Sequence, residues 1–173
     1  MQSESTFELG TESYREGALL RLREAWVLYY QEEWVGCIYL AGRAAESILR
    51  SLIWARTRKR EVGHDLRDLL KRVRMIVTFG ETNEARLDDA VNELAIVWRN
   101  DLRYTGQSRF RRMLDASRRL RSIRGVPVKG DPLKANAKSV LEAAEGIVAR
   151  GEPYARKTAG QAGSSDRTAP KTR

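Results

Sequence analysis

A repeat of apolar residues between positions 34 and 58 restricts the fold of this chain more than any other feature of its sequence. Apolar side chains recur there in alternating steps of four and three residues, at Trp34, Ile38, Ala41, Ala45, Ile48, Leu52 and Ala55. Such steps place the side chains on one face of an α-helix, and an average period of 3.5 residues is typical of a long helix packed nearly parallel or antiparallel to a neighbour. The segment therefore predicts one long helix inside a helical bundle.

Five further stretches show helical periodicity, and glycine-containing turns separate them. The predicted helices cover approximately residues 13–31, 34–58, 65–77, 81–104, 108–121 and 131–150. No segment alternates polar and apolar residues as a half-buried strand would. We therefore predict an all-α fold, an up-and-down helical bundle of about six helices.

Two of these helices carry more detailed expectations. In the first helix, Leu19, Leu22 and Trp26 fall on one face together with Tyr29 or Tyr30, so we expect this face to be buried. In the second helix, the small residues Gly42, Ala44 and Ala45 would let another helix approach closely.

The chain length of 173 residues fits a single domain. We expect residues 1–12 to form a disordered N-terminus and residues 13–150 to form the helical domain. Residues 151–173 are mainly Gly, Ala, Ser, Thr and basic residues with little to bury, so we expect a disordered basic tail there.

The positive charge of the chain is concentrated in one segment. The net charge is +9, and the segment from Arg99 to Arg124 contains nine arginines and no lysine against only Asp101 and Asp115. Guanidinium groups bind phosphate through two parallel hydrogen bonds, so this segment favours contact with nucleic acid or another polyanion. The candidate nucleic-acid-binding residues are Arg99, Asn100, Arg103, Arg109, Arg111, Arg112, Arg118, Arg119 and Arg121.

The remaining reactive residue types suggest structural roles. Cys37 is the only cysteine and lies in an apolar helical stretch, so we expect it to be buried. His64 is the only histidine, and its position at a helix start beside Asp65 predicts a capping contact or a bridge to a neighbouring helix. Arg43, Glu46 and Arg50 follow at steps of three and four, the spacing of an ion-pair ladder.

Several classes of protein are not supported by the sequence. One histidine and one cysteine do not supply a metal site, and we predict neither a metal nor a cofactor. The first ten residues are polar and acidic, unlike a secretory signal, and no apolar run reaches the length of a membrane span. We therefore expect a cytoplasmic protein without membrane contact.

Three segments together resemble the HEPN family of helical-bundle domains. They are Tyr39–Arg50 in the long helix, the helix start from Gly63 to Leu70, and the sequence Trp98–Tyr104. The resemblance covers roughly residues 13–148. It implies a helical bundle that self-associates as a homodimer, an expectation that the four Trp and six Tyr residues also favour. In active members, paired arginines and histidines at the dimer interface cleave RNA without a metal.

The chain departs from this family at the catalytic histidine. Arg99 and Asn100 match the beginning of the family motif, an arginine followed after four to six residues by a histidine. Here four residues separate Arg99 from Tyr104, and no histidine occurs after Arg99. Tyrosine is a poor general base at neutral pH because the pKa of a free phenol is about 10, whereas that of a free imidazole is about 6.5.

These observations lead to one leading hypothesis about function and two alternatives. We predict a non-catalytic or weakly active HEPN-like domain that binds RNA or another polyanion through its arginine-rich surface. The first alternative is a metal-independent ribonuclease, a toxin or defence effector that uses Arg99 and Tyr104 as catalytic residues. The second alternative is a subunit of a protein complex, such as a toxin–antitoxin pair, whose arginines bind an acidic protein partner.

Overall fold

The computed structural model describes residues 10–162, with side chains up to Arg156, and it confirms an all-α helical bundle. Six α-helices, one short 3₁₀ helix and one small hairpin make up this part of the chain. In chain order the elements are α1 (Thr11–Tyr30), α2 (Trp34–Thr57), α3 (Leu66–Arg74), α4 (Glu81–Val97), the 3₁₀ helix η1 (Asn100–Tyr104), α5 (Gln107–Ala116), β1 (Ser122–Ile123), β2 (Val126–Pro127) and α6 (Pro132–Ala162).

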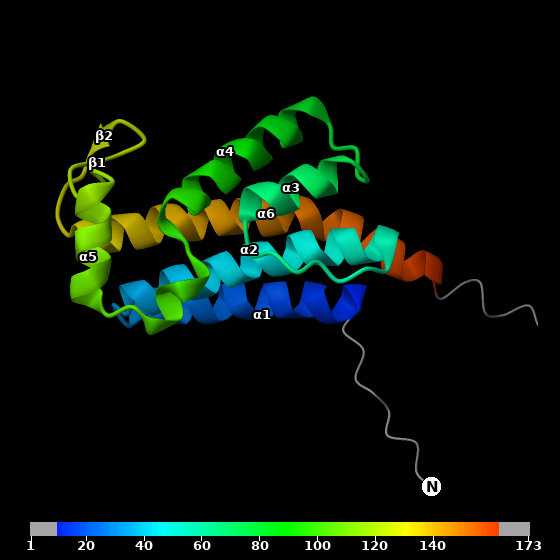
Figure 1. Ribbon diagram of the computed structural model, residues 1–173, viewed down its shortest axis with the longest axis horizontal. Coiled ribbons are helices and arrows are strands. Elements are labelled where there is room, and N and C mark those ends of the chain that lie inside the picture. The colour runs from blue at the N-terminus through cyan, green and yellow to red at the C-terminus, as the bar shows by residue number, and fades with distance from the viewer. Residues whose placement is uncertain (1–9, 163–173) are drawn as a thin grey trace, which may run out of the picture.

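The helices form a bundle whose two ends differ (Figure 1). Helices α1, α2 and α6 run along the long axis and contact one another, while α3 packs on α2 and α4 packs on α6. Helix α5 and the hairpin cover the end of the bundle opposite to the beginning of α1 and the end of α6. The hairpin pairs Ser122 with Pro127 and Ile123 with Val126.

The long helix α2 is the centre of the core, as its apolar repeat predicts. All seven residues of the repeat are buried, and Ile38, Ala41 and Ile48 have no exposed surface. The helix packs between α1 and α6, so apolar residues on more than one side are covered. Complete burial of one large aliphatic side chain contributes about 1.5–3 kcal/mol, which makes this helix a major source of stability.

Helix α1 buries a different face from the one predicted. Ala18 and Ala25 are fully buried, whereas Leu19 is 39% exposed and Tyr30 is 75% exposed. Leu22, Trp26 and Tyr29 lie at the margin, partly buried against the core. The expectation that Leu19 joins the buried face is therefore wrong, because α1 contacts its neighbours through its alanines and leaves several larger side chains outside.

The connection between α2 and α3 runs back along α2 before α3 begins (Figure 1). Helix α2 ends at Thr57, and the next residue, Arg58, adopts the left-handed conformation with φ 56°. Helix α3 starts after Asp65, whose carboxylate accepts hydrogen bonds from the backbone N–H groups of Arg67 and Asp68. This N-cap fixes the end of the connection, which holds His64.

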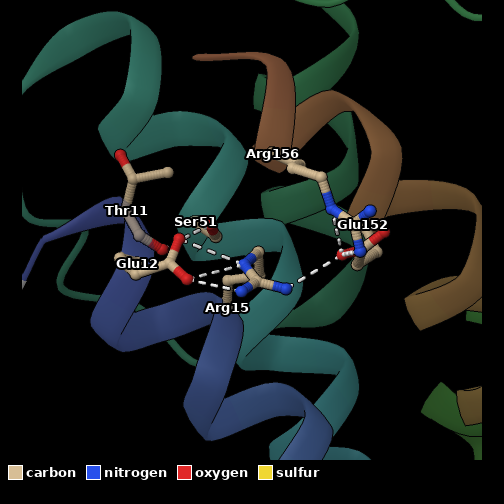
Figure 2. Close-up of polar contacts among 6 residues, drawn as sticks. All are labelled: Thr11, Glu12, Arg15, Ser51, Glu152 and Arg156. Atoms are coloured by element: carbon tan, nitrogen blue, oxygen red, sulfur yellow. Dashed lines mark hydrogen bonds and ion pairs between the residues drawn. The ribbon is translucent and has the colours of Figure 1, made fainter. Parts of the chain in front are cut away.

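Helix α6 continues beyond its predicted end at Arg150, so residues 151–162 are helical rather than part of a disordered tail. Gly151 packs so closely on α2 that a Cβ atom there would lie 2.8 Å from Cγ1 of Ile48. Figure 2 shows Arg15 of α1 between Glu12 and Glu152, with 2.9 Å between its Nη1 and the Glu152 carboxylate. These contacts explain the longer helix. The expected disordered N-terminus 1–12 is also shorter than predicted, because α1 already begins at Thr11. The rest of the two expected disordered segments, residues 1–9 and 163–173, lies outside the described residues.

Candidate nucleic-acid interface

Seven exposed arginines lie on η1, α5 and the turns next to them. Helix α5 is located at one end of the bundle (Figure 1). Among the side chains of residues 10–156, none of these seven makes an ion pair or a hydrogen bond, and the segment from Arg99 to Arg124 contains only Asp101 and Asp115 as carboxylates. We call these residues the arginine surface: Arg99, Arg103, Arg109, Arg111, Arg112, Arg118 and Arg121. They retain their hydrogen-bonding capacity for an external anion.

Helix α5 presents three of these arginines because its other face is apolar. Phe110 has no exposed surface and Leu114 is only 1% exposed, so both anchor the helix on the bundle. Arg112 follows Arg109 at a step of three positions, so the two are neighbours on the outer side. The helix is shorter than the predicted 108–121, since it covers Gln107–Ala116.

The chain turns sharply where α5 ends. Arg118 has a left-handed backbone with φ 58°, its N–H donates to the carbonyl of Asp115, and the N–H of Arg119 donates to the carbonyl of Leu114 at 2.7 Å. This pair of hydrogen bonds is the usual C-terminal motif of a helix that ends in a left-handed residue. As a result, two adjacent arginines lie in opposite environments, Arg118 exposed and Arg119 buried.

Arg119 is a structural residue, which corrects its assignment as a nucleic-acid-binding residue. It is 4% exposed, and its two Nη atoms donate to both carboxylate oxygens of Glu93 in α4, with 3.1 Å between Nη1 and Oε2. Its Nε donates to Oδ1 of Asn136 in α6 at 2.7 Å. Ser139 and Arg124 also donate to Glu93, at 2.6 and 3.2 Å. The network fixes the end of α5 to α4 and α6.

The pKa of Glu93 leads to a prediction about acid stability. Burial alone would raise this pKa, but hydrogen bonds from Arg119, Ser139 and Arg124 and the charge of Arg119 outweigh burial and lower it to about 2. Because the folded-state pKa lies below the unfolded value, the stabilisation is complete above about pH 4.5 and is lost as the pH falls toward 2. We expect Glu93 to account for a loss of about 2–3 kcal/mol in the free energy of unfolding over this range.

Urea titrations of the wild type and Glu93→Gln between pH 5 and pH 2.5 measure this effect. The variant should be less stable than the wild type at pH 5, and its stability should depend less steeply on pH. Equal slopes in both proteins would show that other carboxylates cause the acid sensitivity.

Trp98 fixes the position of the chain just before Arg99. Its indole lies on Gly42 of α2, where a Cβ atom would be 2.0 Å from the ring, and its Nε1 donates to the carbonyl of Tyr39 at 3.1 Å. The small residue Gly42 thus admits an aromatic side chain rather than the predicted neighbouring helix. Helix α4 ends at Val97, and Trp98 and Arg99 are extended, so the predicted continuous helix to Tyr104 is wrong.

Arg99 lines a shallow cavity of about 380 Å³ between α4 and α5. Phe110, Met113 and the half-exposed Ile96 contribute to the apolar part of its lining. Asn100 is half-buried at the start of η1, and its side chain makes no hydrogen bond within the described part of the chain. Both residues of the motif are therefore located beside the arginine surface.

Tyr104 lies at the end of η1 and is 76% exposed. The guanidinium of Arg103 stacks over its ring, 4.7 Å from the centroid. No hydrogen bond or ion pair joins Arg99 to Tyr104 in the region that the structure covers. The two residues proposed for catalysis in the ribonuclease alternative are thus near in sequence, but no polar interaction joins them in the described part of the chain.

The predicted ion-pair ladder on α2 is confirmed, and His64 belongs to it. Glu46 is 1% exposed and binds Arg43 at 2.5 Å, Nε of Arg50 at 2.7 Å and Nδ1 of His64 at 2.8 Å. His64 therefore bridges to a neighbouring helix, one of its two predicted roles. These residues also line a cavity, a feature that was not predicted from the sequence, although the spacing of Arg43, Glu46 and Arg50 could have indicated a shared site.

Cys37 is buried as predicted, and burial raises the pKa of its thiol to about 12, so the unreactive thiol form dominates at neutral pH. Within the described residues, no three His, Cys, Asp or Glu side chains are arranged to hold a metal ion. Every helix in residues 10–162 is too short or too polar to cross a membrane.

Comparisons with known proteins gave no match: no family model, no curated protein and no solved structure is significantly similar to this chain.

Proposed function

We propose that this protein binds RNA through the arginine surface. The observation that carries the proposal is the set of seven exposed guanidinium groups that make no hydrogen bond or ion pair with the described side chains, in a segment with only two carboxylates. Elsewhere on the molecule, Arg15, Arg43 and Arg74 are bound to carboxylates. Unpaired arginines clustered at one end favour a phosphate backbone as the partner, because its charges are regularly spaced.

Single-stranded RNA fits this surface better than a duplex. The side chain of Tyr104 is largely exposed, and the guanidinium of Arg103 covers one face of its ring. An unpaired base can stack on an exposed aromatic ring, and stacked aromatic and arginine planes are typical of single-strand recognition. The HEPN resemblance and the expected homodimer are further parts of this proposal, and analytical ultracentrifugation can test the homodimer.

We expect the affinity for a single-stranded RNA to fall steeply with salt, with a slope of about −3 or steeper in log affinity against log salt concentration. Each phosphate of a single strand that the protein binds contributes about −0.7 to this slope. The triple variant Arg109→Gln, Arg111→Gln and Arg112→Gln should therefore flatten the slope by about 2 and weaken binding about tenfold or more at 100 mM salt. Fluorescence anisotropy with a labelled RNA measures both quantities.

A matched control removes three positive charges elsewhere. Arg23, Arg56 and Arg86 are also exposed, and their side chains make no ion pair within the described residues. Their combined change to glutamine should leave the slope nearly unchanged. Equal losses in both triple variants, or an affinity that is independent of salt, would contradict a specific surface. Absence of RNA binding altogether would leave the acidic protein partner as the better hypothesis.

The same RNA tests the ribonuclease alternative. On our proposal the protein leaves the RNA intact, and Tyr104→Phe retains salt-sensitive binding with at most a small loss, since the aromatic ring is kept. Cleavage that disappears in Tyr104→Phe while affinity persists would instead show a group that acts in the transition state.

A further inference from the structure

A second cavity, of about 400 Å³, lies between α1, α2 and the connection from α2 to α3. Tyr14 comes from α1, Arg43 and Ser47 come from α2, and Arg60 and His64 come from the connection. The volume is in the range of pockets that hold small ligands. With Arg50 of α2 included, three arginines, two hydroxyl groups and one imidazole therefore surround a space that is large enough for a small molecule.

The two carboxylates in the cavity wall are already bound to cations of the protein. Glu46 accepts hydrogen bonds from Arg43 and Arg50 and contacts Nδ1 of His64. Glu61 binds Arg72 at 2.5 Å. Because both negative charges are neutralised inside the protein, the groups that remain available are mainly hydrogen-bond donors. Such a lining favours an anionic ligand over a cation.

Several donors in the wall have no partner in the part of the chain that is described. The guanidinium of Arg60 and the hydroxyl groups of Tyr14 and Ser47 make no hydrogen bond there. Arg43 uses only Nη1 for Glu46, which leaves its other nitrogens available. His64 uses Nδ1 for Glu46, so its Nε2 remains for a ligand.

The connection that supplies Arg60 and His64 is held in place without a ligand. Arg50 is 9% exposed, and its guanidinium donates to the backbone carbonyl of Glu61 and, at 2.5 Å, to that of Gly63. These bonds flank Val62 and fix the backbone between Arg60 and His64. A site whose loop is ordered in advance loses less conformational entropy when the ligand binds.

We infer that this cavity binds a phosphate monoester, carried either by a free nucleotide or by the 5′ end of an RNA. A monoester phosphate has a charge of about −1.5 to −2 and three acceptor oxygens. Two arginines can neutralise this charge, and the hydroxyl groups of Tyr14 and Ser47 can donate to the remaining oxygens. A carboxylate ligand, with one charge and two oxygens, would leave more of these donors unused. The site is separate from the arginine surface and shares no residue with it.

Adenosine 5′-monophosphate is a suitable probe, and adenosine without phosphate is its control. His64 is the only histidine of the chain, so its imidazole signals in an NMR spectrum need no further assignment. We expect adenosine 5′-monophosphate to shift these signals in a saturable manner and adenosine to leave them unchanged. Equal shifts with both compounds, or no shift with either, would overturn the inference.

Paired variants locate the bound phosphate. Arg60→Gln removes a guanidinium that binds nothing else in the described chain, so the fold should persist, as circular dichroism can verify. We expect this change to weaken the binding of adenosine 5′-monophosphate about tenfold, the effect of one charge-assisted hydrogen bond. Arg56→Gln, which lies outside the cavity, should have no effect. The site would be contradicted if both variants lost the same affinity for adenosine 5′-monophosphate. It would also be contradicted if only the triple variant Arg109→Gln, Arg111→Gln and Arg112→Gln lost affinity.

Two RNAs of the same sequence, with a 5′-phosphate or a 5′-hydroxyl, then separate the two sources of the monoester. A preference for the phosphorylated RNA that disappears in Arg60→Gln identifies the RNA end as the ligand. If adenosine 5′-monophosphate binds in an Arg60-dependent manner and the two RNAs bind equally, the ligand is a free nucleotide. If Arg60→Gln changes neither comparison, the cavity does not bind a phosphate monoester.

Discussion

Replacement of Arg119 by alanine is expected to lower the free energy of unfolding by about 3–5 kcal/mol. The change leaves the carboxylate of Glu93 buried, at 3% exposure, without its main cation, and it also removes the hydrogen bond to Asn136. In a domain of this size, each 1 kcal/mol corresponds to about 2–4 °C, so the melting temperature should fall by about 10 °C. Thermal unfolding followed by circular dichroism measures the effect.

Arg121→Ala is the matched control, because it removes the same group from an exposed position two residues away. Exposed substitutions of this kind usually change stability by less than about 0.5 kcal/mol. The RNA affinities should follow the opposite order, with a loss in Arg121→Ala and little change in Arg119→Ala at temperatures where it is folded. If both variants were equally stable, the buried ion pair would contribute nothing to the fold.

A double variant separates the ion pair from the burial of charge. When Glu93 and Arg119 are both replaced by apolar residues, as in Glu93→Leu with Arg119→Met, neither position carries a buried charge that lacks its partner. We expect this variant to be more stable than Arg119→Ala. The recovery should be partial, because Ser139 and Arg124 also lose the carboxylate to which they donate.

Replacement of Trp98 by alanine is the second change with a large expected effect, about 3–5 kcal/mol of unfolding free energy. The indole is 5% exposed, and it fills the space above Gly42. Its loss creates a cavity and removes the hydrogen bond that the indole donates to the carbonyl of Tyr39. Urea denaturation gives the size of the loss. Since Trp98 directly precedes Arg99, the variant should also bind RNA more weakly.

Gly42→Ala tests the same contact from the other side. The added methyl group would lie 2.0 Å from the indole, so the ring must move, and we expect a loss of about 2–3 kcal/mol. The double variant with Trp98→Ala should lose less than the sum of the single losses. Gly17→Ala in α1 is the control, because no atom lies within 4 Å of its Cβ position, and it should stabilise the helix slightly. Additive losses would mean that the two residues do not interact.

The sequence predicted elements well where a repeat extended over many residues. The repeat from Trp34 to Ala55 correctly identified the helix and one of its buried faces, since burial of a helix face requires such a period, but α2 is also buried on other sides, for example at Leu49 and Ile53. The prediction was weaker for α1, where alanines face the core and larger side chains remain outside. The hydrophobicity of the residues alone does not distinguish a helix face of small residues, which lets a neighbouring helix pack closely, from a face of larger apolar residues that stays partly exposed.

The candidate site shows why local sequence was insufficient for the remaining features. Arg118 and Arg119 are identical in type and adjacent, yet one is exposed and the other buried. The difference depends on a left-handed turn and on Glu93, which is 26 positions away from Arg119. Likewise, the extension of α6 past Arg150 depends on Ile48 and Arg15, far away in sequence. Long-range partners of this kind leave no local pattern.

The position of α6 has a consequence for the order in which the chain can fold during its synthesis. Helix α2 packs on both α1 and α6, but α6 follows all the other described helices in the chain. When α1 to α5 have left the ribosome, the side of α2 that α6 covers is still in contact with water. The ion pair between Arg15 and Glu152 joins residues 137 positions apart. Contacts over such separations form late, so during synthesis the apolar side of α2 that α6 later covers is exposed and can be bound by chaperones.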